Sequence, residues 1–317
     1  MSAATDTPPN VWSATPTPFT EKMALDKVAV RRLVEHHIRL GVTGLFVLGT
    51  CGEGAWMTDH QRREMVETVV KHNAGRMRIA VQVTDNSAAR ILDNMHMARQ
   101  AGADVAVIAP PYFLANDTPR TIKKLYLEAI RQSPLPVGIY DRGRHGPVVV
   151  PDELLKPIYS APEVVMVKDS SLEPQRRDIA LEVRQKRPEL LLLNGYEFDC
   201  VQYLQAGYDG LLLGGGIFNG YIAGQIMHAV AEGRLADAEK LQKRMNRIMW
   251  DVYGGKQIKC WLSGQKRLLV EMGVFRTWRN YPDYPLTAAC ERAIMRAVER
   301  DADVLAPWKA GAPCRRK

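Results

Sequence analysis

Short apolar runs alternate with amphipathic stretches along most of the chain. Eight of these runs are nearly continuous in apolar character, at residues 11–15, 44–49, 78–83, 105–110, 136–141, 164–169, 190–195 and 210–215. Strands that are covered on both faces, as in a parallel sheet, have this character, whereas half-exposed strands alternate between apolar and polar residues. The pattern therefore predicts eight buried parallel strands.

The segments between these runs carry helix signals. Asp26, Thr58 and Ser87 each precede a stretch with apolar residues at three- and four-residue spacing, and Gly41 and Gly102 follow two of these stretches. Such residues are favoured at helix starts and ends. Eight strand–helix units predict a (β/α)₈ TIM barrel of the α/β class. An open doubly wound sheet usually has a glycine-rich turn after its first strand, where this sequence reads PTPFTEK.

Three more helical stretches follow the eighth strand, at about residues 221–252, 258–272 and 286–300. We interpret them as the last barrel helix followed by a small C-terminal helical appendage. The predicted division is a barrel with the active site at residues 1–232, a helical region at 233–305, and a flexible basic tail at 306–317.

Charge and cysteine content narrow the range of partners and compartments. The net charge is +8, but lysines and arginines fall mostly beside acidic residues on the predicted helices, without interleaved aromatic residues. We therefore expect no nucleic-acid partner. No apolar run approaches the roughly 20 residues that span a bilayer, and the first ten residues are polar, so we expect no membrane association. Five scattered cysteines without a CxxC pair are typical of a reduced, cytoplasmic protein.

Lys168 is the most conspicuous candidate for chemistry. In TIM barrels, residues at the C-terminal ends of the strands converge on the active site. Lys168 interrupts the apolar run VVMVK and has the same parity as Met166, so its amine is predicted to point into the barrel mouth as a nucleophile. The alternative is a lysine that is only ion-paired, to Asp169 or Glu53. Tyr140 lies at equivalent depth one strand away and could carry protons for the amine; alternatively, it is a core tyrosine.

The turn after the second strand, LGTCGEGAW, places two glycines around Thr50 and Cys51. Exposed backbone N–H groups and a hydroxyl in a tight turn make a small site suitable for a carboxylate. Glu53 in the same turn is expected to be structural. His145 is the only histidine at a strand end, which disfavours a metal-dependent lyase. The glycine run at 214–216 is interpreted as a tight turn lining the site, in preference to a phosphate site.

Four motifs occur in a characteristic order: GTCGE after the second strand, PPYF after the fourth, IYDRGRHG after the fifth and VKDSS after the sixth. They resemble the dihydrodipicolinate synthase/N-acetylneuraminate lyase family, over about residues 10–305. The resemblance implies that Lys168 forms a Schiff base with pyruvate or a longer 2-keto acid, with Tyr140 as proton shuttle and Thr50 as a third catalytic residue. No cofactor other than this covalent imine and no metal is expected.

The resemblance also implies a set of binding residues and an assembly. Gly49 and Cys51 would hold the carboxylate of the keto acid, and Arg144 would hold a carboxylate of the second substrate. Leu212 and Phe113 are the other predicted substrate-binding residues. An aldehyde is the expected co-substrate or product, and the expected assembly is a homotetramer built as a dimer of dimers.

Two positions depart from the family pattern. Cys51 stands where members usually have a second hydroxyl residue, and Phe113 stands where the synthase has a tyrosine that reaches across a dimer contact. Two parts of the synthase proton relay are therefore missing, so we predict a Schiff-base lyase or aldolase other than the synthase itself. Alternatives are a dehydratase of a 2-keto-3-deoxy sugar acid that uses the same imine, and a family member that binds without catalysis.

Overall fold

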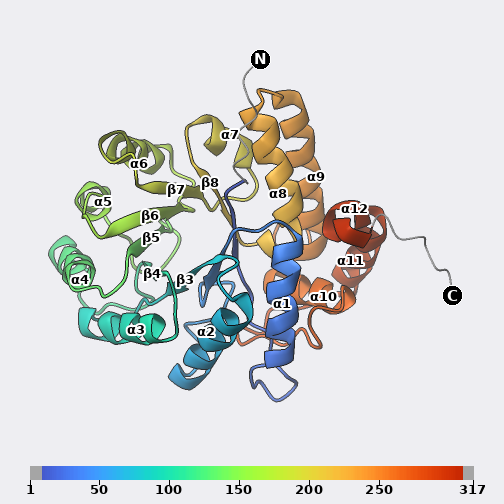
Figure 1. The fold of residues 1–317 in the computed structure, drawn as a ribbon, viewed down its shortest axis with the longest axis horizontal. Helices are drawn as coiled ribbons and strands as arrows, with labels where there is room; N and C mark the ends of the chain where they lie inside the picture. Colours follow the sequence, from blue (N-terminus) through green and yellow to red (C-terminus); the bar gives the residue numbers. More distant parts are fainter. Residues whose placement is uncertain (1–8, 310–317) are drawn as a thin grey trace.

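The computed structural model describes residues 9–309 of the 317-residue chain. Eight parallel strands close into a barrel in sequence order, with β1 paired to both β2 and β8. The strands are β1 (Val11–Ala14), β2 (Gly44–Val47), β3 (Arg78–Gln82), β4 (Val105–Ile108), β5 (Val137–Asp141), β6 (Val164–Asp169), β7 (Leu191–Asn194) and β8 (Gly210–Leu213). The predicted TIM barrel is confirmed (Figure 1).

Each strand is followed by a helix on the outside of the barrel (Figure 1). The helices are α1 (Lys27–Arg39), α2 (Asp59–Asn73), α3 (Ala88–Gln100), α4 (Pro119–Arg131), α5 (Asp152–Tyr159), α6 (Pro174–Lys186), α7 (Cys200–Gln205) and α8 (Gly216–Ala231). The predicted N-caps of α1, α2 and α3 are confirmed, because the side chains of Asp26, Thr58 and Ser87 each accept a hydrogen bond from the backbone N–H three residues later. These contacts satisfy N–H groups that have no partner within the helix.

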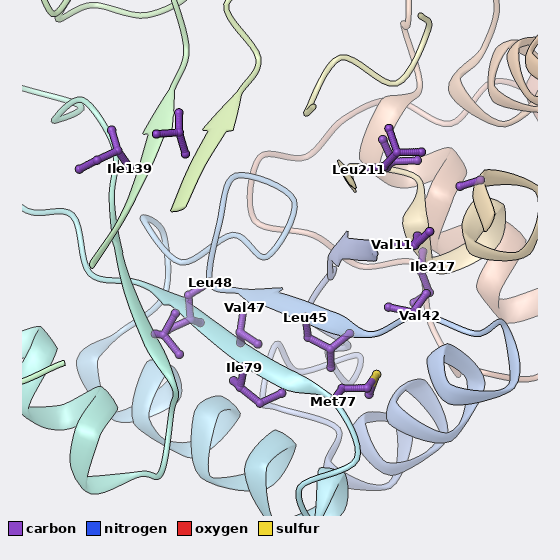
Figure 2. Packing of buried hydrophobic residues seen from close by; sticks show 14 of the residues in the cluster. Val11, Val42, Leu45, Val47, Leu48, Met77, Ile79, Ile139, Leu211 and Ile217 are labelled. Carbon is purple, nitrogen blue, oxygen red and sulfur yellow. The ribbon is translucent and has the colours of Figure 1, made fainter. Parts of the chain in front are cut away.

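Buried side chains form two apolar layers. The outer layer lies between the strands and the helices, and Figure 2 shows Leu45 and Val47 of β2 beside Ile79 of β3 in this layer. The inner layer fills the barrel with side chains of the opposite parity, including Trp12, Ala14, Phe46, Ala80, Val105, Val107, Met166, Leu193 and Leu212. Because side chains alternate between the two faces of a strand, each residue's parity decides which layer it joins.

The C-terminal helices differ from the prediction at one point. The expected single helix at 221–252 is wrong, because α8 ends at Ala231 and a separate helix, α9 (Leu235–Tyr253), follows it. Gly233 between them has a φ of 72°, a left-handed conformation that ends a right-handed helix. The remaining helices are α10 (Trp261–Glu271), α11 (Ala288–Arg300), α12 (Ala302–Leu305) and the 3₁₀ turn η1 (Pro307–Lys309). α10 and α11 pack against α9, and α12 packs against α8 (Figure 1).

Some sequence-based expectations fall at the chain ends. The polar N-terminal residues 1–8 and residues 310–317 of the predicted basic tail lie outside the described residues, as does Cys314. The four described cysteines, Cys51, Cys200, Cys260 and Cys290, are buried free thiols. None of the helices between residues 9 and 309 has the length and apolar character needed to cross a bilayer.

Candidate active site

Lys168 and Tyr140 face each other inside the barrel mouth. They are register partners on β6 and β5, and both are buried, at 5% and 9% exposure. Lys168 Nζ lies 4.2 Å from the centre of the Tyr140 ring and 5.2 Å from the centre of the Phe46 ring. The inward parity that the sequence predicted for Lys168 is confirmed, since Met166, two residues earlier, belongs to the inner layer. The amine is therefore held in an aromatic pocket at the C-terminal end of the strands.

Lys168 has no ion-pair partner among residues 9–309. The carboxylate of Asp169 accepts hydrogen bonds from Tyr208 Oη at 2.5 Å and from Ser171 N at 2.8 Å. Glu53, the other partner considered, is ion-paired with Lys266. Both structural explanations for Lys168 are thus contradicted by the positions of these carboxylates.

Glu53 is a structural residue, as the sequence suggested. It is fully buried, it pairs with the equally buried Lys266 of α10, and its Oε2 accepts a hydrogen bond from Tyr281 N at 2.7 Å. Burial raises the pKa of Glu53 and lowers the pKa of Lys266, and the attraction between the two groups opposes both shifts. Glu53 also has a φ of 59°, so this ion pair fixes a tight turn of unusual backbone conformation.

Thr50 and Cys51 occupy the turn after β2. The Thr50 hydroxyl oxygen is buried and has no hydrogen-bond partner among the described residues. The Cys51 sulfur lies 4.0 Å from the carbonyl oxygen of Gly214, and burial raises the pKa of this thiol to about 12. The two side chains therefore present a neutral thiol and a hydroxyl that is available to a ligand. Gly49 allows the turn to pass close to Phe46, because a Cβ there would lie 2.7 Å from the Phe46 ring.

The remaining predicted binding residues are distributed differently. Leu212 lies inside the barrel in the same layer as Tyr140. Phe113 is 66% exposed at the surface. Arg144 is ion-paired with Asp152 and Glu173, each at 3.3 Å, so contact with a substrate carboxylate would require these pairs to open.

Asp141, the last residue of β5, has protein partners for its carboxylate. The Asp141 carboxylate pairs with the buried Arg176 at 2.9 Å and accepts a hydrogen bond from Tyr159 Oη at 2.7 Å. It is therefore engaged on the helix side of the barrel. Within residues 9–309, no group of three or more His, Cys, Asp or Glu side chains is arranged to hold a metal ion.

Glu197 is a buried carboxyl residue near Lys168 to which the sequence analysis assigned no role. It follows β7 and is buried, and its Oε2 accepts a hydrogen bond from Gly215 N at 2.6 Å while its Oε1 accepts one from Tyr253 Oη at 2.7 Å. Burial raises the pKa of Glu197, whereas these hydrogen bonds and the nearby Lys168 lower it. Its position after a barrel strand was visible in the sequence, but its partner Tyr253, 56 residues away, was not.

The sequence matches the Dihydrodipicolinate synthetase family over residues 7–300. The chain belongs to this family. N-acetylneuraminate lyases of Escherichia coli O1:K1 and of Shigella boydii serotype 4 are each 26% identical to it over 287 residues, which is 89% of both chains. Membership in this family, together with the similarity to these lyases, supports aldol and retro-aldol chemistry for this chain.

Solved structures of the Dihydrodipicolinate synthetase family share the fold. The dihydrodipicolinate synthase of Bacteroides thetaiotaomicron has a TM-score of 0.83 and 25% identity, over 92% of this chain and 98% of the other. A prophage protein of the dihydrodipicolinic acid synthase family from E. coli K12, solved in complex with pyruvate, has a TM-score of 0.80 and 20% identity, over 92% of this chain and 98% of the other. The barrel with its C-terminal helices is thus the fold of the family.

Proposed function

We propose that the chain is a class I lyase in which Lys168 forms an imine with pyruvate or a longer 2-keto acid. The observation that carries the proposal is the Lys168–Tyr140 pair: a buried, unpaired amine at the mouth of the barrel, with a tyrosine opposite it on the neighbouring strand. A lysine amine without a counter-charge is available to attack a carbonyl carbon. Neither residue is needed at this place to fold a barrel.

The proposed reaction begins with attack of Lys168 Nζ on the C2 carbonyl carbon of the keto acid. The resulting carbinolamine loses water when the Tyr140 phenol supplies a proton to the departing hydroxyl, which leaves a protonated imine. The imine withdraws electrons from C3, so a C3–C4 bond can break in the retro-aldol direction or form in the aldol direction. Water then releases the keto acid from Lys168.

The turn after β2 is the proposed site for the keto-acid carboxylate. Its support is the Thr50 hydroxyl, which is buried and lacks a partner among residues 9–309, in a turn with glycines on both sides of Thr50 and Cys51. Hydroxyl and backbone N–H donors in a tight turn suit an anion. The family member from E. coli K12 that was solved with pyruvate agrees with this choice of substrate class.

A homotetramer in the cytoplasm completes the proposal. Phe113 and Trp56 are 66% and 46% exposed, and large aromatic side chains on a surface favour contact with a second copy. The four described thiols are free, which agrees with a reducing compartment. Light scattering on a size-exclusion column would measure the assembly, and a monomer at micromolar concentration would contradict it.

Borohydride trapping tests the proposed function. The protein is incubated with pyruvate, reduced, and analysed by intact mass and peptide mapping, together with Lys168→Met and the control Lys186→Met, which removes a lysine of α6 whose side chain is 69% exposed. We expect a reduced pyruvyl adduct on Lys168 in the wild type and in the control, and none in Lys168→Met. Absence of an adduct with pyruvate and with longer 2-keto acids would overturn the proposal. With an adduct in hand, assays with aldehydes and with deoxy-keto acids separate C–C cleavage from dehydration.

A further inference from the structure

Glu197 and Lys168 are two buried ionisable groups inside one barrel, and neither has an ion-pair partner among the described residues. The remaining buried carboxylates at the strand ends are occupied: Asp141 by Arg176, Asp169 by Tyr208, and Glu53 by Lys266. Lys168 and Glu197 influence each other electrostatically without forming a salt bridge. A ligand held between the two groups would face an amine on one side and a carboxyl on the other.

Two glycines, Gly195 and Gly214, lie in close contact with Lys168 and Glu197, respectively. A Cβ on Gly195 would lie 2.9 Å from Lys168 Cε, so the lysine chain runs directly over the loop that leads to Glu197. A Cβ on Gly214 would lie 3.4 Å from both Cys51 Sγ and Glu197 Oε1. Glu197 therefore borders the same position as the thiol of the proposed carboxylate turn, and a keto acid held by Lys168 would have Glu197 beside it.

The groups that face Glu197 come from five elements. They are Lys168 of β6, Cys51 after β2, Cys200 of α7, Tyr253 of α9 and the backbone N–H of Gly215 after β8. The two thiols are neutral, because burial raises the pKa of Cys51 to about 12 and raises that of Cys200 well above its ordinary value. Only Lys168 and the hydrogen bonds from Gly215 and Tyr253 thus oppose the burial of a charged Glu197.

We infer that Glu197 is the catalytic acid–base residue for the aldehyde oxygen, and that Tyr253 is the positioning residue that holds it. The inference rests on the proposed function. In the aldol direction, the C3 carbon of the enamine on Lys168 attacks the aldehyde carbon, and a C–C bond forms. The π electrons of the aldehyde C=O bond move to its oxygen, which takes the proton of the Glu197 carboxyl and becomes a hydroxyl. The enamine becomes an iminium. The reverse sequence is the retro-aldol cleavage.

This assignment divides the proton transfers between two residues of the site. Glu197 enters the step neutral and leaves it as a carboxylate, and the hydrogen bonds from Tyr253 and Gly215 stabilise that charge as it forms. Tyr140 remains the proton shuttle for imine formation, so the two residues act at different atoms of the substrate.

The neutral form of Glu197 has a consequence for pyruvate alone. Pyruvate is an anion, and a second carboxylate in the same buried space repels it. As the pH rises through the pKa of Glu197, the affinity for pyruvate should fall, whereas Glu197→Gln stays neutral and keeps the high affinity. Loss of the Tyr253 hydrogen bond would raise the pKa of Glu197, so in Tyr253→Phe the fall should begin at higher pH.

The test measures borohydride trapping of pyruvate as a function of concentration and pH. Four proteins are compared: wild type, Glu197→Gln, Tyr253→Phe, and Tyr159→Phe, which loses a buried hydrogen bond of the same 2.7 Å length to Asp141. We expect the wild-type affinity to fall relative to Glu197→Gln by about tenfold or more over the titration. Tyr253→Phe should displace this fall to higher pH, and Tyr159→Phe should follow the wild type. With an aldehyde that is turned over, Glu197→Gln should slow C–C bond formation by about 10²–10⁴-fold.

The outcomes separate the two proposals. Lack of any adduct in the wild type removes the proposed function, and this inference with it. An adduct whose pH dependence is the same in wild type and Glu197→Gln overturns the role of Glu197 and leaves the imine intact. A Tyr253→Phe profile that coincides with that of Tyr159→Phe shows that Tyr253 contributes only packing, and so overturns its positioning role.

Discussion

Lys168 Nζ lies 4.2 Å from the centre of the Tyr140 ring, and the two residues stand directly opposite each other on β6 and β5. The register of two parallel strands sets this distance, so it depends on the barrel and not on a mobile loop. Tyr140 also packs edge-on against Phe46, with ring centres 5.8 Å apart, so its ring is held from a second strand. Lys168 and Tyr140 are thus placed by paired strands of the barrel and by packing against a third strand.

The variant Tyr140→Phe removes the hydroxyl and keeps the aromatic ring, so it tests the role of the hydroxyl alone. The ring contacts with Lys168 and Phe46 remain, so the free energy of unfolding should change by less than about 1 kcal/mol. The rate of pyruvate trapping should fall by about 10²–10⁴-fold, because the proton for the departing hydroxyl is lost, while the adduct still forms on Lys168. Stopped-time borohydride quenching measures this rate. An unchanged rate would show that Tyr140 is only a core residue.

Gly195→Ala should slow the reaction of Lys168 with pyruvate, because the added methyl group would displace the lysine side chain. The added Cβ would lie 2.1 Å from Ser170 Oγ and 2.9 Å from Lys168 Cε, closer than real Cβ atoms approach other atoms. We expect pyruvate trapping to slow by at least about tenfold, because displacement of a nucleophile by about 1 Å has large effects on rate. The control is Gly224→Ala on α8, where the nearest atom would be 3.4 Å away and alanine should favour the helix. Equal trapping rates in the two variants would contradict the prediction.

Lys266→Met should be strongly destabilising. The change leaves the Glu53 carboxyl buried without its partner, and removal of one member of a buried ion pair costs about 3–5 kcal/mol. Urea unfolding followed by circular dichroism measures the loss. The double variant Lys266→Met/Glu53→Gln should recover part of it, since no buried charge then remains. A loss below about 1 kcal/mol in the single variant would show that Glu53 finds another partner.

His36 and His37 of α1 should make the fold sensitive to acid. Burial lowers the pKa of His36 to about 4 and that of His37 to about 3, from an ordinary value of 6.5. Below about pH 6.5 the unfolded chain takes up protons that the folded chain does not, so the free energy of unfolding should fall as the pH drops from about 6.5 towards 4. Each histidine contributes up to about 1.4 kcal/mol per pH unit. Urea unfolding at several pH values should give a smaller slope for His37→Gln. Equal slopes in the two proteins would contradict the shift.

The fold was largely predictable because its signal is local. Continuous apolar runs reveal doubly covered strands, and the caps at Asp26, Thr58 and Ser87 mark helix starts within a few residues of sequence. The break between α8 and α9 was missed because the residues on both sides of Gly233 are good helix formers. Only the left-handed conformation of that glycine ends the first helix there.

The positions of candidate site residues were predictable only where one strand carries the information. Lys168 and Tyr140 follow from parity and from the convergence of strand ends. Arg144 shows the limit of that reasoning. It pairs with Asp152, the first residue of α5, and with Glu173, the N-cap of α6, and the order of residues in the sequence does not reveal such pairs. Glu197 was recognisable as a residue at a strand end, but its role was not, because its hydrogen-bond partner Tyr253 comes from a helix beyond the barrel.

The C-terminal helices contact the site at several points. Tyr253 of α9 holds Glu197, Gln265 of α10 donates to the Gly214 carbonyl oxygen at 2.7 Å, and Lys266 holds Glu53. The division at residue 232 therefore separates two stretches of sequence but not two exchangeable modules. A chimera that joined this barrel to the terminal helices of a relative would have the relative's residues in place of Tyr253, Gln265 and Lys266. Swapping α9 and α10 between family members is thus a route by which recombination could change substrate range while every strand of the barrel stays the same.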